Sequence, residues 1–261
     1  MTNLLARIWL ALLACAALAG CGGADGVTRV AAASSLRPAL MEIAAGFEQE
    51  SGHRVELVFG SSGNFYQQLQ QDAPFELFLS ADEDYVLDLA RSGKTRDEGQ
   101  VYALGRLALV APPGSALQLD PQLDGLRQAL ANDEVEQFAI ANPEHAPYGQ
   151  RAREALERAG LWQHLQGKLV MGENVAQALQ FTLTGGAQGG IVASSLLHDP
   201  ALAGQADHVL IPADWHQPLR QRMVLMDHAG PVAEQFYSYL SGEQARQVFE
   251  RNGFSVPAGT E

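Results

Sequence analysis

The chain has 261 residues, of which 47% are hydrophobic and 18% charged, and its formal net charge is −13 at pH 7. This composition is typical of a globular protein that is long enough for one large domain or two lobes. The excess of acidic over basic residues argues against a nucleic acid as the partner, because phosphate backbones are bound by clustered Lys and Arg.

The amino-terminal segment predicts an export signal. Arg7 is the only charged residue among the first 20, and the apolar run over 8–19 is too short for a membrane span. The run ends in Leu18-Ala19-Gly20-Cys21, which resembles the lipobox of bacterial lipoproteins. We therefore expect a signal peptide over 1–20, cleavage before Cys21 and a lipid on its thiol. A plain secretory signal with an incidental cysteine is the alternative.

The other cysteine of the chain, Cys15, lies within the predicted signal peptide, so no disulfide is expected in the mature chain. Residues 21–26 are rich in glycine and are expected to form a flexible tether. No later segment is long and apolar enough to span a bilayer. We therefore expect a protein of the periplasm or the cell surface that touches the membrane only through its lipid.

From residue 27 onward, strand and helix patterns alternate. Strand-like segments at 27–32, 55–59 and 76–80 are each followed by apolar residues at helical spacing. This β-α-β-α-β-α order is typical of a parallel sheet with helices on its faces.

The second half of the chain continues the alternation. One long strand is predicted over 104–111, a helix follows through Leu126 and Leu130, and a last extended piece covers 254–257. The remaining predicted strands cover 138–141, 168–171, 190–193, 209–211 and 223–226, and the remaining helices cover 152–159, 175–183, 232–240 and 244–251. The predicted fold class is α/β.

Four strand-to-helix junctions, at Ser34, Ser62, Tyr148 and Val175, are candidate binding elements. A serine at such a junction can be an ordinary N-cap. The same geometry also offers hydroxyls and free N–H groups to an anion, with the positive end of the helix dipole behind them. In open α/β sheets, ligands bind at the carboxyl ends of strands, so the four junctions can face one cleft.

Six motifs stand in an order that is similar to the periplasmic molybdate-binding proteins of ABC importers, the ModA family. The resemblance covers about 27–256 and rests on Ala31-Ala32-Ala33-Ser34-Ser35-Leu36, Gly60-Ser61-Ser62-Gly63, Phe78-Leu79-Ser80-Ala81-Asp82, Asn142-Pro143-Glu144-His145-Ala146-Pro147-Tyr148-Gly149, Glu173-Asn174-Val175 and Gly189-Gly190-Ile191-Val192.

The resemblance implies a two-lobed periplasmic binding protein fold of type II, with each lobe a mixed β-sheet flanked by helices. Two crossover strands, near 104–111 and 223–226, would join lobe I (27–105 and 218–261) to lobe II (106–217). Closure of the lobes would capture molybdate, or tungstate of nearly the same size. A monomer would then deliver the anion to an ABC permease with a cytoplasmic ATPase, without a cofactor and without catalysing a reaction.

Carried over to this sequence, the resemblance assigns hydroxyl and N–H donors to Ser34 and Ser62, and backbone N–H donors to Tyr148 and Val175. The sequence departs from the family's commonest pattern in two places. Many members have a small residue where Tyr148 stands and a ligand-binding tyrosine where Ala193 stands. We expect the Tyr148 hydroxyl to replace the missing donor.

Other residues near these motifs have structural interpretations. Asp82 is expected to cap a helix or to join the lobes, and His145 to bond loop backbone. The seven histidines lack the spacing of a cation site, so no metal is expected except within the oxyanion.

Three alternatives stay open. The same fold can bind sulfate or a small organic anion, and a sensor or adhesion lipoprotein can share it. A secreted serine hydrolase using Ser34 or Ser62 is the third, although neither a G-x-S-x-G elbow nor a Ser-x-x-Lys pair surrounds them.

Overall fold

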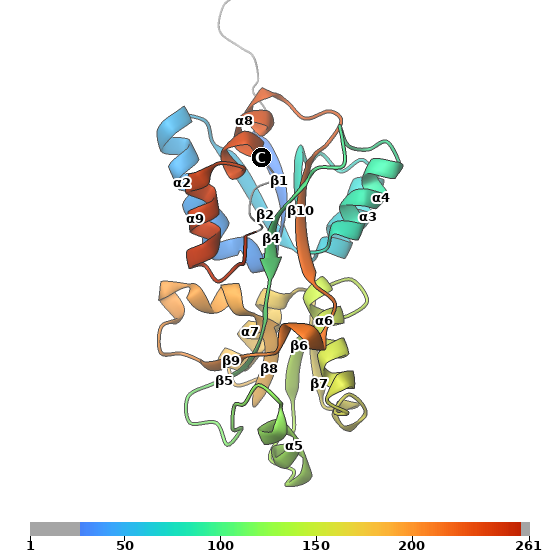
Figure 1. Ribbon diagram of the computed structural model, residues 1–261, viewed down its shortest axis with the longest axis vertical. Coiled ribbons are helices and arrows are strands. Elements are labelled where there is room, and N and C mark those ends of the chain that lie inside the picture. Colours follow the sequence, from blue (N-terminus) through green and yellow to red (C-terminus); the bar gives the residue numbers. More distant parts are fainter. Residues whose placement is uncertain (1–26, 257–261) are drawn as a thin grey trace, which may run out of the picture.

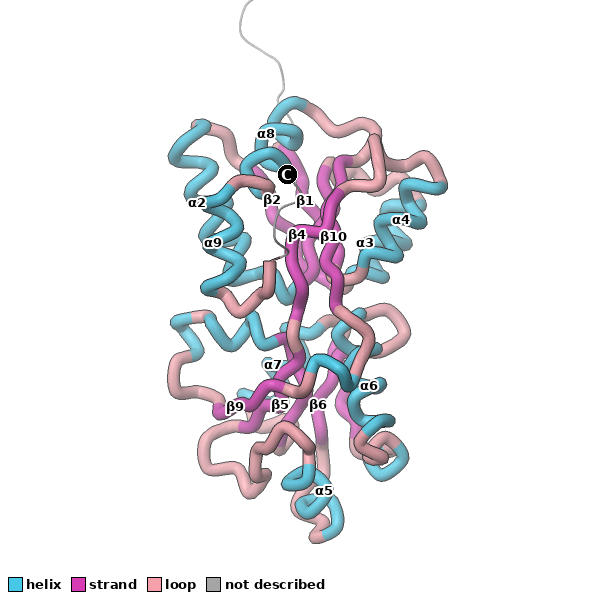
Figure 2. Tube along the Cα trace, viewed as in Figure 1, coloured by secondary structure: helices cyan, strands magenta, loops and turns pink. Residues whose placement is uncertain are grey.

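The computed structural model describes residues 27–256 and has two lobes stacked along its long axis (Figure 1). The predicted signal peptide, Cys21, the tether and Pro257 lie outside the described residues. Each lobe contains a five-stranded sheet with helices on both faces (Figure 2). Within 27–256, no helix is long and apolar enough to cross a bilayer.

The first lobe is built on a sheet with the strand order β2-β1-β3-β10-β4. Strand β1 runs parallel to β2 and β3, and β10 runs antiparallel to β3 and β4, so the sheet is mixed. The strands are β1 (Thr28–Ala33), β2 (Val55–Gly60), β3 (Leu77–Ser80), β4 (Gln100–Gly105) and β10 (Leu219–Leu225). The helices are α2 (Arg37–Ser51), α3 (Ser62–Gln70), α4 (Glu83–Arg91), α8 (Pro231–Leu240) and α9 (Glu243–Arg251).

Alternating side chains of this sheet fill two separate cores. Leu77, Leu79 and Met223 point to the face covered by α2, α8 and α9. Phe78 and Val224 point to the face covered by α3 and α4. Strands that are buried on both faces read as continuous apolar runs, which is why the sequence reveals them so clearly.

The second lobe has the strand order β7-β6-β8-β5-β9 and is also mixed. Its strands are β5 (Leu107–Ala111), β6 (Phe138–Ala141), β7 (Leu169–Gly172), β8 (Gly189–Ala193) and β9 (Asp207–Leu210). Its helices are α5 (Asp124–Ala131), α6 (Pro147–Arg158) and α7 (Val175–Leu183). Five short 3₁₀ turns complete the described chain: η1 (Ser34–Leu36), η2 (Gln163–Leu165), η3 (Ser194–His198), η4 (Pro200–Leu202) and η5 (Ala213–Trp215).

Two segments connect the lobes, and both differ from the sequence expectation. The strand predicted over 104–111 is two strands: β4 ends at Gly105 in the first sheet, and β5 begins at Leu107 in the second. The two are nearly continuous, so apolar patterning alone could not separate them.

The second crossing lies just before the stretch near 223–226 where a crossover strand was expected, and not within it. Met223 and Val224 pair with β3 inside the first sheet. The chain crosses instead between the end of β9 and the start of β10, a polar stretch that holds η5 and is bounded by Pro212 and Pro218. The apolar residues mark the interior of a sheet and not the exposed connection.

Candidate functional site

The structure brings Ser34, Ser62, Tyr148 and Val175 to one small pocket between the lobes. From the first lobe it is lined by Ala33, Ser34, Ser35, Gly60, Ser61, Ser62 and Ala81, and from the second by Ala146, Pro147, Tyr148, Asn174 and Val175. None of these lining residues carries an ionised side chain at neutral pH. The predicted site residues are therefore neighbours, although up to 141 positions separate them in the sequence.

Ser62 is the first residue of α3 and is buried. Its Oγ accepts a hydrogen bond from the Ala81 N–H at 2.9 Å. That bond occupies a lone pair of the hydroxyl, so its own proton is available to the pocket. The backbone N–H of Ser62 makes no hydrogen bond to any residue within 27–256.

Ser34 follows β1 directly and opens η1. Its Oγ lies 3.4 Å from the Ala176 nitrogen of the other lobe, which donates to it. The hydroxyl of Ser34 is thereby also left to act as a donor.

Tyr148 is the second residue of α6, after Pro147. Proline is favoured at this first helical position because its nitrogen has no hydrogen to leave unpaired. The Tyr148 N–H finds no acceptor in the described part of the chain, so it faces the pocket as a free donor.

Val175 is the first residue of α7, and its N–H is free for a related reason. The Asn174 side chain caps the helix by accepting from Ala176 and Gln177 at 3.1 and 3.2 Å. The cap therefore pairs the N–H groups of Ala176 and Gln177 but leaves the Val175 N–H unpaired. No residue within 27–256 accepts a hydrogen bond from the Val175 N–H.

The amino termini of α3, α6 and α7 therefore converge on a pocket that contains only donors and neutral groups. Each helix end contributes about half a positive charge. Such a site suits a compact, fully deprotonated anion, because a proton-bearing oxyanion would find no carboxylate among the lining residues to accept its proton.

The Tyr148 hydroxyl faces protein groups, and only 2% of the residue is exposed. It accepts a hydrogen bond from Gln221 Nε2 at 3.0 Å. Burial raises the pKa of Tyr148 well above its ordinary value, although nearby Ser35, Gln221 and Ser195 act in the opposite direction. The phenol is therefore protonated at every working pH.

Backbone contacts close the two lobes around the pocket. The carbonyl of His145 accepts hydrogen bonds from the Gly63 N–H, at 2.9 Å, and from the Ser61 hydroxyl. In a second contact between the lobes, the Ser195 hydroxyl donates to the Ser35 carbonyl at 2.8 Å. His145 therefore has a structural role across the lobes, although its ring contacts side chains and not the loop backbone that was expected.

The His145 ring lies between Ser61 and Glu173, and this serine–histidine–carboxylate arrangement resembles a hydrolase triad. Its Nδ1 lies 3.0 Å from Ser61 Oγ, and its Nε2 lies 3.5 Å from Glu173 Oε2. The Ser61 proton, however, is donated to the His145 carbonyl and not to the ring. The serines of the predicted hydrolase alternative, Ser34 and Ser62, have no histidine partner among the described residues.

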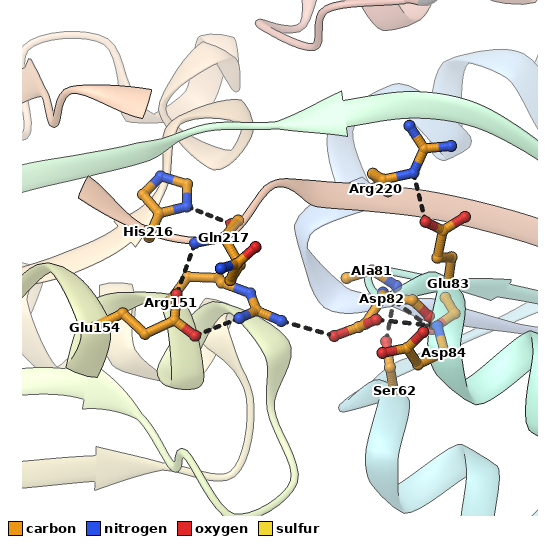
Figure 3. Close-up of polar contacts among 11 residues, drawn as sticks. Ser62, Ala81, Asp82, Glu83, Asp84, Arg151, Glu154, His216, Gln217 and Arg220 are labelled. Atoms are coloured by element: carbon orange, nitrogen blue, oxygen red, sulfur yellow. Dashed lines mark hydrogen bonds and ion pairs between the residues drawn. The ribbon is translucent and has the colours of Figure 1, made fainter. Parts of the chain in front are cut away.

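Asp82 joins the lobes beside the pocket, and it also caps a helix (Figure 3). Its Oδ1 accepts from the Asp84 N–H at 3.0 Å, and its Oδ2 pairs with Arg151 of α6 at 3.1 Å. Arg151 pairs in turn with Glu154. The Glu154 carboxylate accepts a hydrogen bond from the Gln217 N–H, in the segment that crosses between the lobes, with a nitrogen–oxygen distance of 2.7 Å. Both structural roles predicted for Asp82 are confirmed.

The sequence interpretation did not select Ser35, Ser61 or Asn174 as site residues, yet all three line the pocket. The signal for two of them was present as the serine pairs at 34–35 and 61–62. The described residues contain no cluster of three or more His, Cys, Asp or Glu side chains that could hold a metal ion.

Comparisons with known proteins place the chain in a family. Residues 28–255 match the family described as bacterial extracellular solute-binding protein. The molybdate-binding protein ModA of Azotobacter vinelandii is 34% identical over 260 residues, covering 98% of each chain. The Escherichia coli ModA is 34% identical over 97% of this chain and 100% of its own.

The structural comparison agrees. The solved periplasmic molybdate-binding protein of Azotobacter vinelandii superimposes with a TM-score of 0.80 at 30% identity, covering 88% of this chain and 100% of that one. A sulfate-binding protein of Mycobacterium tuberculosis, at 16% identity and a TM-score of 0.72, shares the fold. The chain belongs to the ModA family of bacterial extracellular solute-binding proteins and has its two-lobed fold.

Proposed function

We propose that this protein captures molybdate between its two lobes and delivers it to an ABC permease with a cytoplasmic ATPase. The observation that carries the proposal is the convergence of three helix amino termini on a pocket without ionised side chains. Relatives that share about a third of its residues are named molybdate-binding proteins, which supports this choice of anion.

Ser34 and Ser62 would bind the anion through hydroxyl and N–H groups, and Tyr148 and Val175 through backbone N–H groups. A charge-assisted hydrogen bond contributes about 1.5–3 kcal/mol net. Several such bonds exceed the ~8 kcal/mol of a micromolar complex and offset dehydration and lobe closure. No formal positive charge is needed in the pocket.

Binding would proceed by closure. The anion would first contact one lobe, and rotation about the two crossings at 105–107 and 211–218 would bring in the other. We propose residues 27–105 and 218–261 as lobe I and residues 106–217 as lobe II. The contacts of Gly63 and Ser61 with His145 support the proposed closure, because these residues lie on different lobes and can meet only when the lobes are closed.

The remaining proposals concern the protein's surroundings. A monomer anchored by a lipid on Cys21, in the periplasm or at the cell surface, would stay near its permease, and a tether raises effective concentration. Tungstate would bind as molybdate does. The protein would need no cofactor and would catalyse no reaction.

Calorimetric titration of the mature protein with molybdate, tungstate and sulfate tests the proposal. We expect micromolar or tighter binding of molybdate and tungstate and much weaker binding of sulfate, which is the smaller anion. Tight binding of sulfate alone, or of none of the three, would overturn it. Labelling of Ser34 or Ser62 by a fluorophosphonate probe would instead revive the hydrolase.

A further inference from the structure

The Tyr148 side chain lies where both crossings enter the first lobe. Gly105 is the last residue of β4, at the first crossing, and Gln221 is the third residue of β10, just after the second. Gln221 donates through Nε2 to the Tyr148 hydroxyl oxygen at 3.0 Å. Because Gln221 belongs to the sheet of the first lobe and Tyr148 to α6 of the second, this hydrogen bond joins the lobes.

Gln221 is held in place from its own lobe. The Tyr102 hydroxyl, on β4, donates to Gln221 Oε1 at 3.1 Å. Gln221 is 0% exposed, and both tyrosines are buried. Both ends of the amide are therefore engaged, one by a tyrosine of each lobe, in a place that water does not reach in this closed arrangement.

An irregularity in the sheet makes this arrangement possible. Gln221 pairs with Ala103 and Arg222 pairs with Val101, so Tyr102 is an extra residue in the ladder between β4 and β10. A regular ladder would direct the side chains of Tyr102 and Gln221 to opposite faces of the sheet. An extra residue re-aims a side chain, and here it lets the two meet.

Gly105 leaves the space that the bond between the lobes occupies. A Cβ atom added to Gly105 would lie 2.2 Å from the Tyr148 hydroxyl and 2.9 Å from Gln221 Nε2. A side chain at the first crossing would therefore separate the phenol from the amide.

Tyr148 connects this bond to the anion pocket. Its backbone N–H faces the pocket, whereas its hydroxyl reaches Gln221 at the crossings. Gln221 itself is not among the residues that line the pocket. A change at Gln221 can therefore reach the anion only through Tyr148 or through the closure of the lobes.

We propose that Gln221 is a positioning residue that couples the bound anion to the two crossings. It fixes the Tyr148 phenol when the lobes close, which keeps the Tyr148 N–H directed at the anion and delays reopening. When the lobes open, the phenol and the amide separate and water pairs with both, so the bond stabilises the closed form alone. This inference rests on the proposed function.

The first test measures molybdate affinity by calorimetry for the wild type, Gln221→Met, Tyr148→Phe and the double variant. Methionine has nearly the shape of glutamine without the amide, and Tyr148→Phe keeps the backbone N–H. Each single variant should bind about 5- to 150-fold more weakly, the equivalent of the 1–3 kcal/mol that a buried unpaired polar group costs. The double variant should bind no more weakly than the more affected single variant, because both changes break the same bond.

The second test measures a property that a merely structural role would not change. Protein loaded with radioactive molybdate is mixed with an excess of unlabelled molybdate, and the loss of label gives the dissociation rate. We expect dissociation of Gln221→Met to be faster in about the proportion by which its affinity falls. The association rate should stay within twofold of wild type, because the anion meets one lobe before the lobes close.

Helix α3 offers a matched control, because Gln70 Nε2 donates to the Tyr66 hydroxyl at 3.2 Å within that one helix. Gln70→Met and Tyr66→Phe break the same kind of bond inside a single lobe. Both should leave the affinity and the dissociation rate within twofold of wild type. Thermal unfolding of each ligand-free variant identifies one that has lost its fold. Gln221→Asn, whose amide is too short to reach both tyrosines, then replaces Gln221→Met.

The outcomes separate this inference from the function on which it rests. A dissociation rate of Gln221→Met within twofold of wild type, or fully additive effects in the double variant, would overturn the inference. An equal loss of affinity in the α3 controls would overturn it as well. Failure of the wild type to bind molybdate contradicts the proposed function itself.

Discussion

At the scale of single residues, the pocket shows how neutral groups can be committed to donation. The Ser62 oxygen accepts from the Ala81 N–H, so its proton is directed elsewhere. Such preorganisation avoids the cost of reorienting dipoles when the anion arrives. It also avoids a buried cation, which would need its own counter-ion when the site is empty.

Ser62→Ala should weaken molybdate binding about 10- to 150-fold, because one charge-assisted bond of about 1.5–3 kcal/mol is lost. Calorimetry of the purified variant measures the change. Ser92→Ala is the control, since the Ser92 hydroxyl bonds only the last turn of α4. Equal molybdate affinities of the two variants would show that Ser62 does not bind the anion.

His216 makes the stability of the protein depend on pH. Burial lowers its pKa, and nearby Arg151 and Arg106 act in the same direction, against the Gln217 carbonyl and Glu154. Its Nδ1 lies 2.7 Å from the Gln217 carbonyl, and its buried Nε2 has no partner in the described residues. Protonation would therefore place an unpaired N–H in the interior.

Because the unfolded chain binds this proton more readily, the free energy of unfolding should be constant well above the ordinary histidine pKa of about 6.5. It should fall as the pH drops below that value toward the folded-state pKa. Urea denaturation between pH 5 and pH 8 measures the slope, which His216→Gln should reduce. His53→Gln, at an exposed site, is the control; an equal reduction there would show that His216 is not responsible.

The sequence was sufficient to select four pocket residues, because helix starts that follow buried strands are local features. The environment of the Tyr148 hydroxyl was not predictable. Its partner is Gln221, which lies 73 residues after Tyr148 on another strand. A local pattern carries no information about such a contact.

At the scale of elements, the ion pair between Asp82 and Arg151 ties α4 to α6 next to the pocket (Figure 3). The two side chains are 15% and 13% exposed, so the pair is screened less than a surface pair. Removing one partner leaves the other charge without compensation.

Arg151→Met should weaken molybdate binding about tenfold, because the Asp82 carboxylate then faces the closing lobe and the anion unpaired. Asp82→Asn should have a smaller effect, since asparagine still caps α4. A double-mutant cycle on the dissociation constant measures the coupling between them. Arg153→Met, which breaks an exposed pair within α6, is the control, and zero coupling energy would show that the pair does not support closure.

The order of the elements was predictable from local patterns, whereas the exact course of the crossings between the lobes was not. Strands that are buried on both faces are recognisable in the sequence as continuous apolar runs, as in β3 and β5. A crossing is defined instead by which sheet each strand joins. The pairing partners of β4 and of Met223 are long-range contacts that hydropathy does not encode.

At the scale of the whole molecule, closure depends on a backbone contact between the lobes. The Gly63 N–H donates to the His145 carbonyl, and a Cβ atom on Gly63 would lie 2.4 Å from that oxygen. Contact this close leaves no space for any side chain, and neither partner is the flexible end of a chain.

Gly63→Ala should therefore hold the lobes apart and weaken molybdate binding at least tenfold. Thermal stability without ligand should change little, because alanine is favourable within α3. Calorimetry gives the affinity, and small-angle scattering with and without molybdate gives the compaction. Asn64→Ala, at the next position of α3, is the control. Wild-type affinity and compaction in Gly63→Ala would show that the contact is not required.

The position of β10 between β3 and β4 also sets the order in which the chain can assemble. All strands of the second lobe's sheet lie in one uninterrupted stretch, 107–210. The sheet of the first lobe is complete only when residues 219–225 have been added. A polypeptide that emerges from its amino terminus can complete the later lobe first. The pocket needs both lobes, so a nascent chain has no binding site until nearly its whole length is available.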